Sequence, residues 1–314
     1  MTGQKEHIPD KFCKVADFPP MLVLWVSNIC NSRCPHCPFN LHSELRQVDK
    51  NKVMPEKVFK RIAWEAGQYG SLIRITGLGE PLLNQKIIDL VEYAIKQGAR
   101  IGFITNGALL NPEKIDRLLK AGIDLIEVSV DAMDKKTYSK IRIGLDFDSV
   151  KRNIELLMSR KRELKAKTIV AVSVINQPDK LKDPQAVVDY WKNKVDTVIF
   201  RKWITWNVLD QANFTEPFLD KSKRVPCPWP FDRLHINSDG LALFCADDLK
   251  RNHVVGDVNR KKIYDIWNGK KFESYRKYHL DRKFDKIDIC AKCADWPYKS
   301  WKYNYFKVLK SERR

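Results

Sequence analysis

Three cysteines lie close together near the N-terminus, in the stretch Cys30-Asn-Ser-Arg-Cys34-Pro-His-Cys37. They follow the apolar run Met21–Val26, which is typical of a buried strand, so one short loop holds all three thiols. Thiolates normally hold the irons of iron–sulfur clusters, and three protein ligands on a [4Fe–4S] cubane would leave one iron open. Zinc with His36 as a fourth ligand is the rival, and buried thiols without a ligand are the third interpretation. His36 stands between two cysteines in a tight loop and would have difficulty reaching the same ion, so the cluster is favoured.

Four more cysteines stand in the last third of the chain, at Cys227, Cys245, Cys290 and Cys293. The stretch Leu234–Cys245 alternates apolar and polar residues around Asn237-Ser-Asp-Gly240, which predicts a β-hairpin. Four thiolates can fully ligate either a zinc ion or a [4Fe–4S] cluster. The spacing alone does not decide between these two metals.

Apolar runs alternate with amphipathic stretches between residues 21 and 200, which is the pattern of βαβ units and a parallel sheet. Strands are expected at 21–27, 72–76, 101–105, 125–130, 168–174 and 197–200, with helices at 55–68, 86–97, 112–121, 148–163 and 183–193. The pattern predicts six βα units of an α/β, TIM-like barrel, with a full eight-unit barrel as the alternative. The expected division is an N-terminal segment (1–20), a barrel (21–205), a second cysteine domain (206–296) and a basic aromatic tail (297–314), whose composition suits an amphipathic closing helix.

Polar residues follow the C-terminal ends of these strands, where barrel enzymes build their active sites. After the second strand, Gly77-Leu-Gly79-Glu80 combines two glycines, which permit close backbone approach, with a carboxylate for a cation. A Gly/Pro turn that merely ends the strand is the alternative. The other candidates for ligand contacts at strand ends are Asn106, Ser129, Asp131, Ser173 and Asn176.

The first cysteine stretch resembles the signature of the radical S-adenosylmethionine (SAM) superfamily, C-x3-C-x-aromatic-C, with His36 at the aromatic position. The resemblance implies an incomplete (β/α)6 barrel and a [4Fe–4S] cluster whose open iron binds SAM. It also implies reductive cleavage of SAM to a 5′-deoxyadenosyl radical, which removes a hydrogen atom from an unactivated carbon. By the same resemblance, Glu80 beside Gly79 takes the SAM ammonium, Arg142 takes its carboxylate, and His36 packs against the cofactor.

The C-terminal third resembles the SPASM/twitch extension of radical SAM enzymes. The likeness rests on the hairpin turn, Gly256-Asp-Val258, the phrase Ile263–Gly269 and the final C-x2-C. In the shorter twitch form, four cysteines hold one auxiliary cluster. No cysteine follows Cys293, so the resemblance implies a second [4Fe–4S] cluster and no third.

The formal net charge is +18, from 57 Lys and Arg against 39 Asp and Glu. This charge favours an anionic small-molecule substrate and an acidic electron donor such as flavodoxin or ferredoxin. Nucleic acid is a less favoured partner, because the basic residues are spread along the chain. The polar N-terminus predicts no signal peptide, and no apolar run approaches the roughly 20 residues of a membrane span. Clustered cysteines without a disulfide pattern indicate a cytoplasmic protein.

In layout the sequence is similar to single-auxiliary-cluster dehydrogenases and epimerases of aminocyclitols and aminoglycosides. The resemblance implies oxidation of a sugar, cyclitol or phosphorylated metabolite, with the auxiliary cluster as electron acceptor. Peptide or protein modification is one alternative. Epimerisation is another, in which Cys13, the cysteine outside both sets, would return a hydrogen atom; a buried apolar thiol is the simpler interpretation of Cys13. An iron–sulfur electron carrier or a zinc-binding interaction protein is the non-enzymatic alternative, and it would leave Glu80 without a purpose.

Overall fold

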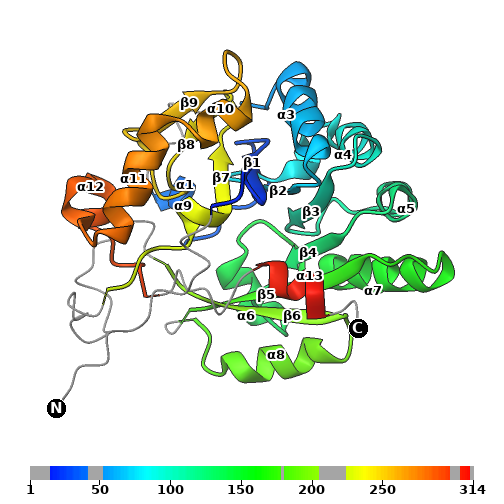
Figure 1. Cartoon of the computed structure of the whole chain (residues 1–314). Coiled ribbons are helices and arrows are strands. Elements are labelled where there is room, and N and C mark those ends of the chain that lie inside the picture. Colours follow the sequence, from blue (N-terminus) through cyan, green and yellow to red (C-terminus); the bar gives the residue numbers. More distant parts are fainter. Residues whose placement is uncertain (1–14, 42–51, 178–179, 205–223, 298–304, 312–314) are drawn as a thin grey trace.

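The computed structural model describes residues 15–41, 52–177, 180–204, 224–297 and 305–311. One sheet of nine strands runs through these residues in the order β6-β5-β4-β3-β2-β1-β7-β8-β9. All strands from β6 to β7 in this order are parallel, whereas β8 and β9 join as antiparallel strands. The sheet curves without closing on itself (Figure 1). The predicted incomplete barrel with a C-terminal hairpin region is therefore confirmed.

The strands are β1 (Met21–Trp25), β2 (Leu72–Thr76), β3 (Arg100–Thr105), β4 (Leu125–Ser129), β5 (Ile169–Asn176), β6 (Thr197–Lys202), β7 (Arg233–Ile236), β8 (Leu241–Leu243) and β9 (Val254–Asp257). The helices are α1 (Pro38–Leu41), α3 (Glu56–Gln68), α4 (Ile87–Lys96), α5 (Pro112–Ala121), α6 (Lys135–Ile141), α7 (Phe147–Glu163), α8 (Pro184–Lys192), α9 (Trp229–Asp232), α10 (Ile263–Trp267), α11 (Lys270–Leu280), α12 (Asp288–Ala291) and α13 (Tyr305–Ser311).

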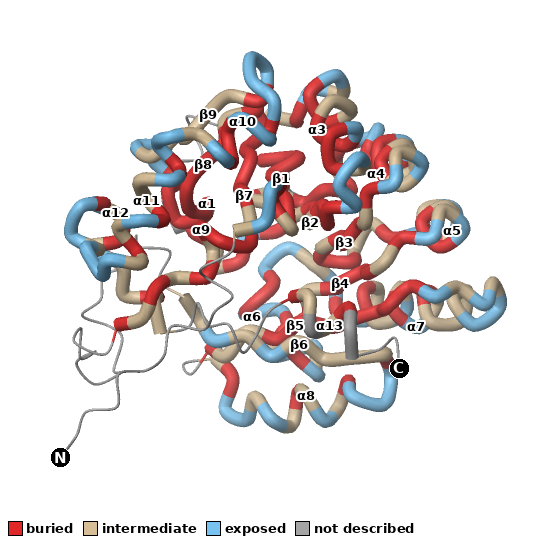
Figure 2. The backbone as a smooth tube through the Cα atoms, viewed as in Figure 1, coloured by how far each residue is buried: buried red, intermediate tan, exposed pale blue. Residues whose placement is uncertain are grey.

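The helices begin and end where the sequence gives local signals. Asn111 caps α5 by accepting a hydrogen bond from the amide of Lys114, and Pro112 supplies the first turn. The same helix ends at Gly122, whose φ of 79° is left-handed. Because side chains alternate along a strand, Ile73, Phe103 and their counterparts face these helices and form the main core. Figure 2 shows burial along the strands and exposure on the outer sides of α5, α7 and α8.

Helix α13 covers part of the opposite, concave face of the sheet. Tyr305 and Leu309 pack against inward-facing residues that include Met21, Leu72 and Leu125. Gly102 permits this approach, since a Cβ at that position would lie 2.6 Å from the Tyr305 hydroxyl oxygen. The closing helix expected from the tail composition is thus present over Tyr305–Ser311 and lies against the inside of the barrel.

The C-terminal region is joined directly to the barrel. Strand β7 pairs in parallel with β1, with Val23 opposite His235. The buried Glu65 of α3 accepts a hydrogen bond of 2.7 Å from the Ile263 amide at the start of α10. Trp267 also donates to the Ala16 carbonyl at 2.7 Å. The sheet is therefore continuous across the predicted domain division, and the stretch just after residue 205 lies outside the described residues.

Membrane insertion through a helix has no support in the described part of the chain. None of the helices there is both long enough and apolar enough to cross a bilayer.

Candidate active site

The first three cysteines lie between the end of β1 and the start of α1. Cys34 is buried, Cys37 is partly buried and Cys30 is exposed. The Ser32 hydroxyl oxygen lies 3.0 Å from Cys34 Sγ, and the Arg142 guanidinium donates to the same sulfur at 3.7 Å. These polar groups would stabilise negative charge on the sulfur, as a cluster-bound thiolate requires.

The thiols of this loop suit a cluster better than a single ion. Burial raises the pKa of Cys37 to about 11, so a bound metal would be needed to hold its thiolate form. Among the described residues, no three His, Cys, Asp or Glu side chains converge closely enough to hold one metal ion. Each thiolate of a cubane binds a different iron, so such convergence is not required.

Glu80 lies beside this loop as a buried carboxylate, at 2% exposure. One oxygen accepts from the Thr105 hydroxyl at 2.7 Å and from the Leu82 amide at 3.1 Å, and the other accepts from the Asn106 amide at 2.7 Å. Burial raises the pKa of Glu80, while these hydrogen bonds oppose the rise. A cationic ligand next to it would hold the carboxylate ionised.

Gly79 allows the Glu80 turn to pack on the cysteine loop. A Cβ at Gly79 would lie 2.5 Å from the carbonyl oxygens of Ser27 and Ile29. The Glu80 amide donates to the Ile29 carbonyl at 2.7 Å, and the Asn106 side chain donates to Asn31 at 2.7 Å. The glycine thus brings backbone against backbone, which places Glu80 and Asn106 next to the predicted cluster loop.

Arg142, Asp131 and His36 form a buried polar group at the other side of the loop. Arg142 forms a 2.5 Å ion pair with Asp131, whose carboxylate lies 4.0 Å from His36 Nε2. Burial and the nearby guanidinium lower the pKa of His36 to about 4, so its imidazole is neutral near pH 7. Asp131 adopts a left-handed φ of 62° and also accepts from the Ile175 amide at 2.7 Å, which fixes its orientation.

Gln177, which sequence reasoning missed, lies next to His36 and is fully buried. Neither its amide oxygen nor its amide nitrogen has a hydrogen-bond partner of good geometry in the described part of the chain. Nothing in the local sequence distinguishes this residue, because its burial depends on the loop after β1. Its interaction with His36 partly offsets the lowering of the His36 pKa.

The structure brings together two of the remaining predicted residues, Ser129 and Ser173. The Ser173 hydroxyl donates to Ser129 at 3.3 Å across β4 and β5, on the concave face. Asn176 alternates to the other face of β5 and makes no hydrogen bond to these residues. Cys13 lies outside the described residues, so its predicted role as a hydrogen donor stays a prediction.

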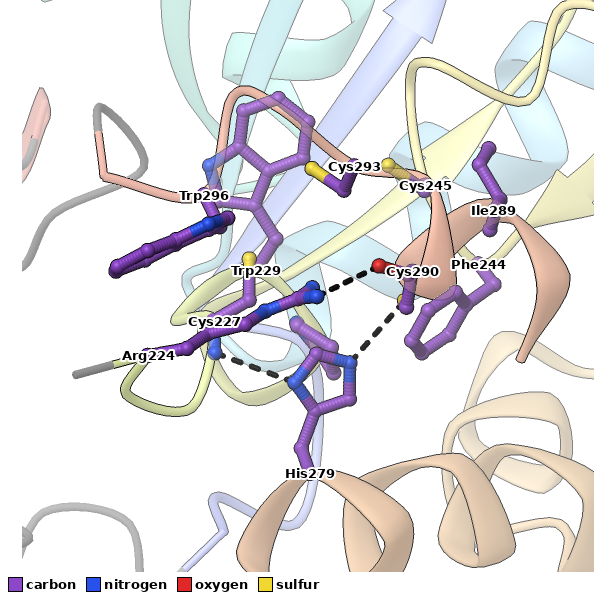
Figure 3. A pocket seen from close by; sticks show the side chains of 11 residues that line it. Arg224, Cys227, Trp229, Phe244, Cys245, His279, Ile289, Cys290, Cys293 and Trp296 are labelled. Carbon is purple, nitrogen blue, oxygen red and sulfur yellow. Dashed lines mark hydrogen bonds between the residues drawn. The ribbon is translucent and has the colours of Figure 1, made fainter. Parts of the chain in front are cut away.

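The second cysteine set surrounds one hollow. Figure 3 shows the thiols of Cys227, Cys245, Cys290 and Cys293 around it. Apolar side chains of Trp229, Phe244 and Trp296 complete its wall. Four thiols around one hollow supply the number of ligands that a fully ligated [4Fe–4S] cubane needs.

His279 joins two of these cysteines. Its Nδ1 accepts a hydrogen bond from the Cys227 amide at 3.2 Å, and its Nε2 lies 3.4 Å from Cys290 Sγ (Figure 3). Because Nδ1 is the acceptor, the neutral ring carries its proton on Nε2 and donates it to the sulfur. No sequence motif marks His279, because its partners Cys227 and Cys290 are 52 and 11 residues away.

Replacing His279 with Phe is expected to lower the reduction potential of the auxiliary cluster by about 40 mV. A hydrogen bond contributes about 1 kcal/mol, and a tenfold change in the equilibrium constant of a one-electron couple corresponds to about 59 mV. The reason is that an N–H donor stabilises the more negative, reduced cluster. Redox titration followed by electron paramagnetic resonance measures the shift. His253→Phe is the control, since His253 contacts Tyr275 rather than a cysteine; equal potentials in wild type and His279→Phe would contradict the assignment.

Two family models match the chain. The Radical SAM superfamily model matches residues 26–180, and the SPASM model, described as an iron-sulfur cluster-binding domain, matches residues 227–294. The chain is a radical SAM enzyme. More particularly, it belongs to the radical SAM proteins that carry a C-terminal SPASM domain. Its cofactors are accordingly SAM with a [4Fe–4S] cluster, and auxiliary iron–sulfur binding in the SPASM domain, so zinc is no longer the competing metal.

A curated relative aligns with this chain over most of both chains. It is the tungsten-containing aldehyde ferredoxin oxidoreductase cofactor-modifying protein of Pyrococcus furiosus. It is 29% identical over 271 residues, which is 84% of this chain and 73% of the relative.

Two solved structures share the fold. The anSMEcpe enzyme with bound AdoMet superposes with a TM-score of 0.67 at 16% identity, covering 93% of this chain and 95% of that one. BtrN in complex with AdoMet and 2-DOIA gives a TM-score of 0.60 at 17% identity, covering 91% and 96%. At these identities the likeness concerns the fold.

Proposed function

We propose that this chain is a radical SAM oxidoreductase of dehydrogenase type that acts on a polar small molecule. The observation that carries the proposal is the ring of four cysteines around the second hollow. A [4Fe–4S] cluster with four protein thiolates has no open iron with which to bind a substrate. Its remaining use is to accept or deliver electrons.

In this proposal Cys30, Cys34 and Cys37 hold the first cluster, and Glu80 accepts the ammonium group of SAM. Arg142 binds the SAM carboxylate. Its buried Nε is suited to this role, because that atom has no hydrogen-bond partner among the described residues. The Ser129–Ser173 pair would contact the ribose or the substrate. When bound, the reduced cluster and SAM supply a 5′-deoxyadenosyl radical, and the protein supplies position and electrostatics.

The electrons and atoms of such an oxidation balance as follows. A carbon bearing a hydroxyl group loses one hydrogen atom to the 5′-deoxyadenosyl radical, which leaves a substrate radical. Loss of one further electron and the hydroxyl proton then gives a carbonyl product. Cys227, Cys245, Cys290 and Cys293 would hold the auxiliary cluster, which would accept this electron. The excess of basic residues would suit an acidic flavodoxin or ferredoxin as the electron donor.

Peptide modification is the second candidate. The anSMEcpe enzyme, which shares the fold, has also been solved with AdoMet and a Cp18Cys peptide, at a TM-score of 0.63 and 16% identity. The structure with 2-DOIA supports the small-molecule alternative. We prefer the small-molecule substrate to the peptide because the sequence layout provides ligands for one auxiliary cluster.

SAM cleavage tests the enzymatic part of this proposal. Anaerobically reconstituted protein with SAM and dithionite is expected to form 5′-deoxyadenosine, measured by chromatography with mass detection. Omission of dithionite is the control, because the cleavage is reductive. Protein that carries its full iron complement and forms no 5′-deoxyadenosine would instead support an electron carrier. Deuterium transfer from labelled candidate substrates into 5′-deoxyadenosine would then identify the substrate.

A further inference from the structure

Arg224 lines the hollow of the second cysteine set (Figure 3). Among the described residues around this hollow it is the only arginine or lysine, and no aspartate or glutamate joins it there. Its exposed fraction is 6%. A guanidinium stays protonated at physiological pH. The wall of the hollow therefore holds a permanent positive charge that is largely shielded from water.

The contacts of Arg224 leave its charge unpaired. Its Nη1 donates to the Cys290 carbonyl at 2.7 Å, and its guanidinium carbon lies 4.2 Å from the centre of the Phe284 ring. The buried Nε has no hydrogen-bond partner within the described ranges, and no carboxylate of those ranges forms an ion pair with the guanidinium. The contact with an aromatic ring stabilises a cation only in part.

The nearby Arg233 is treated differently. Its guanidinium carbon lies 5.3 Å from the centre of the Trp229 ring, which also lines the hollow. Asp232 neutralises Arg233 through two contacts at 2.5 and 2.9 Å. Burial of an unpaired charge is costly, so a neutral donor would serve better than Arg224 if a bond to the Cys290 carbonyl were all that was needed.

An iron–sulfur cluster in this hollow would supply the missing negative charge. Four cysteine thiolates outweigh the positive charge of a [4Fe–4S] core, so a fully ligated cluster is an anion, and one-electron reduction makes it more negative. A guanidinium at the wall stabilises the reduced form more than the oxidised form. This interaction is stronger in the interior than at the surface, because water weakens the interaction of exposed charges.

We infer that Arg224 is the counter-charge of the auxiliary cluster and raises its reduction potential. The hydrogen bond to Cys290 and the contact with Phe284 hold the guanidinium in place, so it need not reorient when an electron arrives. In the proposed reaction the substrate radical loses one electron and the oxidised cluster gains it. A higher potential favours this transfer. The inference deepens the proposed function and rests on it.

Redox titration of the reconstituted full chain, followed by electron paramagnetic resonance, tests the inference without SAM or substrate. The signal that survives when the first three cysteines are replaced with alanine identifies the auxiliary cluster. Arg224→Gln keeps an N–H donor for the Cys290 carbonyl and removes the charge. It should lower the equilibrium constant for one-electron reduction by about tenfold to a hundredfold. At about 59 mV per tenfold change, the potential falls by about 60 to 120 mV.

Two further variants separate the charge from local structure. Arg224→Lys keeps the charge and a donor for the single bond to Cys290, so its equilibrium constant should stay within about threefold of wild type. Arg282→Gln is the matched control, because it removes an exposed charge just after α11, the helix that carries His279. Its equilibrium constant should also stay within about threefold of wild type, since solvent and salt screen that charge.

Loss of the cluster from Arg224→Gln with retention by Arg224→Lys would also support the inference. Three results would overturn it: a constant for Arg224→Gln within about threefold of wild type, equal losses in Arg224→Gln and Arg224→Lys, or an equal shift in Arg282→Gln. A wild-type chain without a reducible auxiliary cluster would overturn the proposed function as well. The enzymatic part of that function is assayed separately, as formation of 5′-deoxyadenosine.

Discussion

Replacing Cys30, Cys34 and Cys37 together with alanine is expected to remove four of about eight irons per chain and to abolish formation of 5′-deoxyadenosine. The reason is that these thiols would hold the cluster whose open iron binds SAM. Iron analysis and the visible absorption of the reconstituted protein measure the first effect, and chromatography measures the second. Retention of SAM cleavage by the triple variant would refute the assignment of the first site.

A matched control separates this effect from general damage to the fold. Cys13→Ala removes a cysteine outside both sets and should keep about eight irons, the content of two cubanes. Far-ultraviolet circular dichroism should show intact secondary structure in the triple variant, because its substitutions lie in a loop and leave β1 and α3 untouched. If the triple variant does not fold, the single variant Cys30→Ala is tested in its place. The Cys30 side chain is exposed and contributes least to packing.

The barrel could be predicted because its signals are local. Each core strand is a short apolar run and each expected helix has an amphipathic pattern, so the six core strands and the five expected helices appear within about two residues of their expected limits. Helix α6, which lies between β4 and β5, was not expected. The hairpin turn at Asn237–Gly240 is equally local, and Gly240 has the left-handed φ of 85° that such a turn needs. These features depend on neighbours in the sequence.

Features that depend on distant contacts were not predictable. The pairing of β7 with β1 joins residues more than 200 positions apart, and no pattern within Arg233–Ile236 specifies it. The same holds for His279, which meets Cys227 and Cys290 only after α11 has packed against them. Arg142 could be proposed as a cofactor contact from the family resemblance, but its ion pair with Asp131 required the fold. Gln177 carries no signal apart from its burial.

Replacing Cys290 with alanine is expected to lower the iron content and to reduce the ratio of oxidised product to 5′-deoxyadenosine by at least ~100-fold. In the proposed reaction the substrate radical must lose an electron, and the auxiliary cluster receives it. Cys290 is buried, and its sulfur accepts the hydrogen bond from His279, so its loss disturbs both the ligand set and that donor. The ratio of oxidised product to 5′-deoxyadenosine is the informative quantity, because a change in SAM cleavage alone would alter both amounts equally.

The same variant distinguishes oxidation from epimerisation once a substrate is identified. An epimerase returns a hydrogen atom to its substrate radical and passes no net electron onward, so Cys13→Ala rather than Cys290→Ala should abolish the inverted product. A dehydrogenase should show the reverse, with Cys13→Ala close to wild type and Cys290→Ala deficient. Product ratios from both variants, measured on the same substrate, give the answer. Zinc found by anomalous scattering at the four cysteines of anaerobically prepared protein would end the electron-transfer role, because zinc has no accessible second oxidation state.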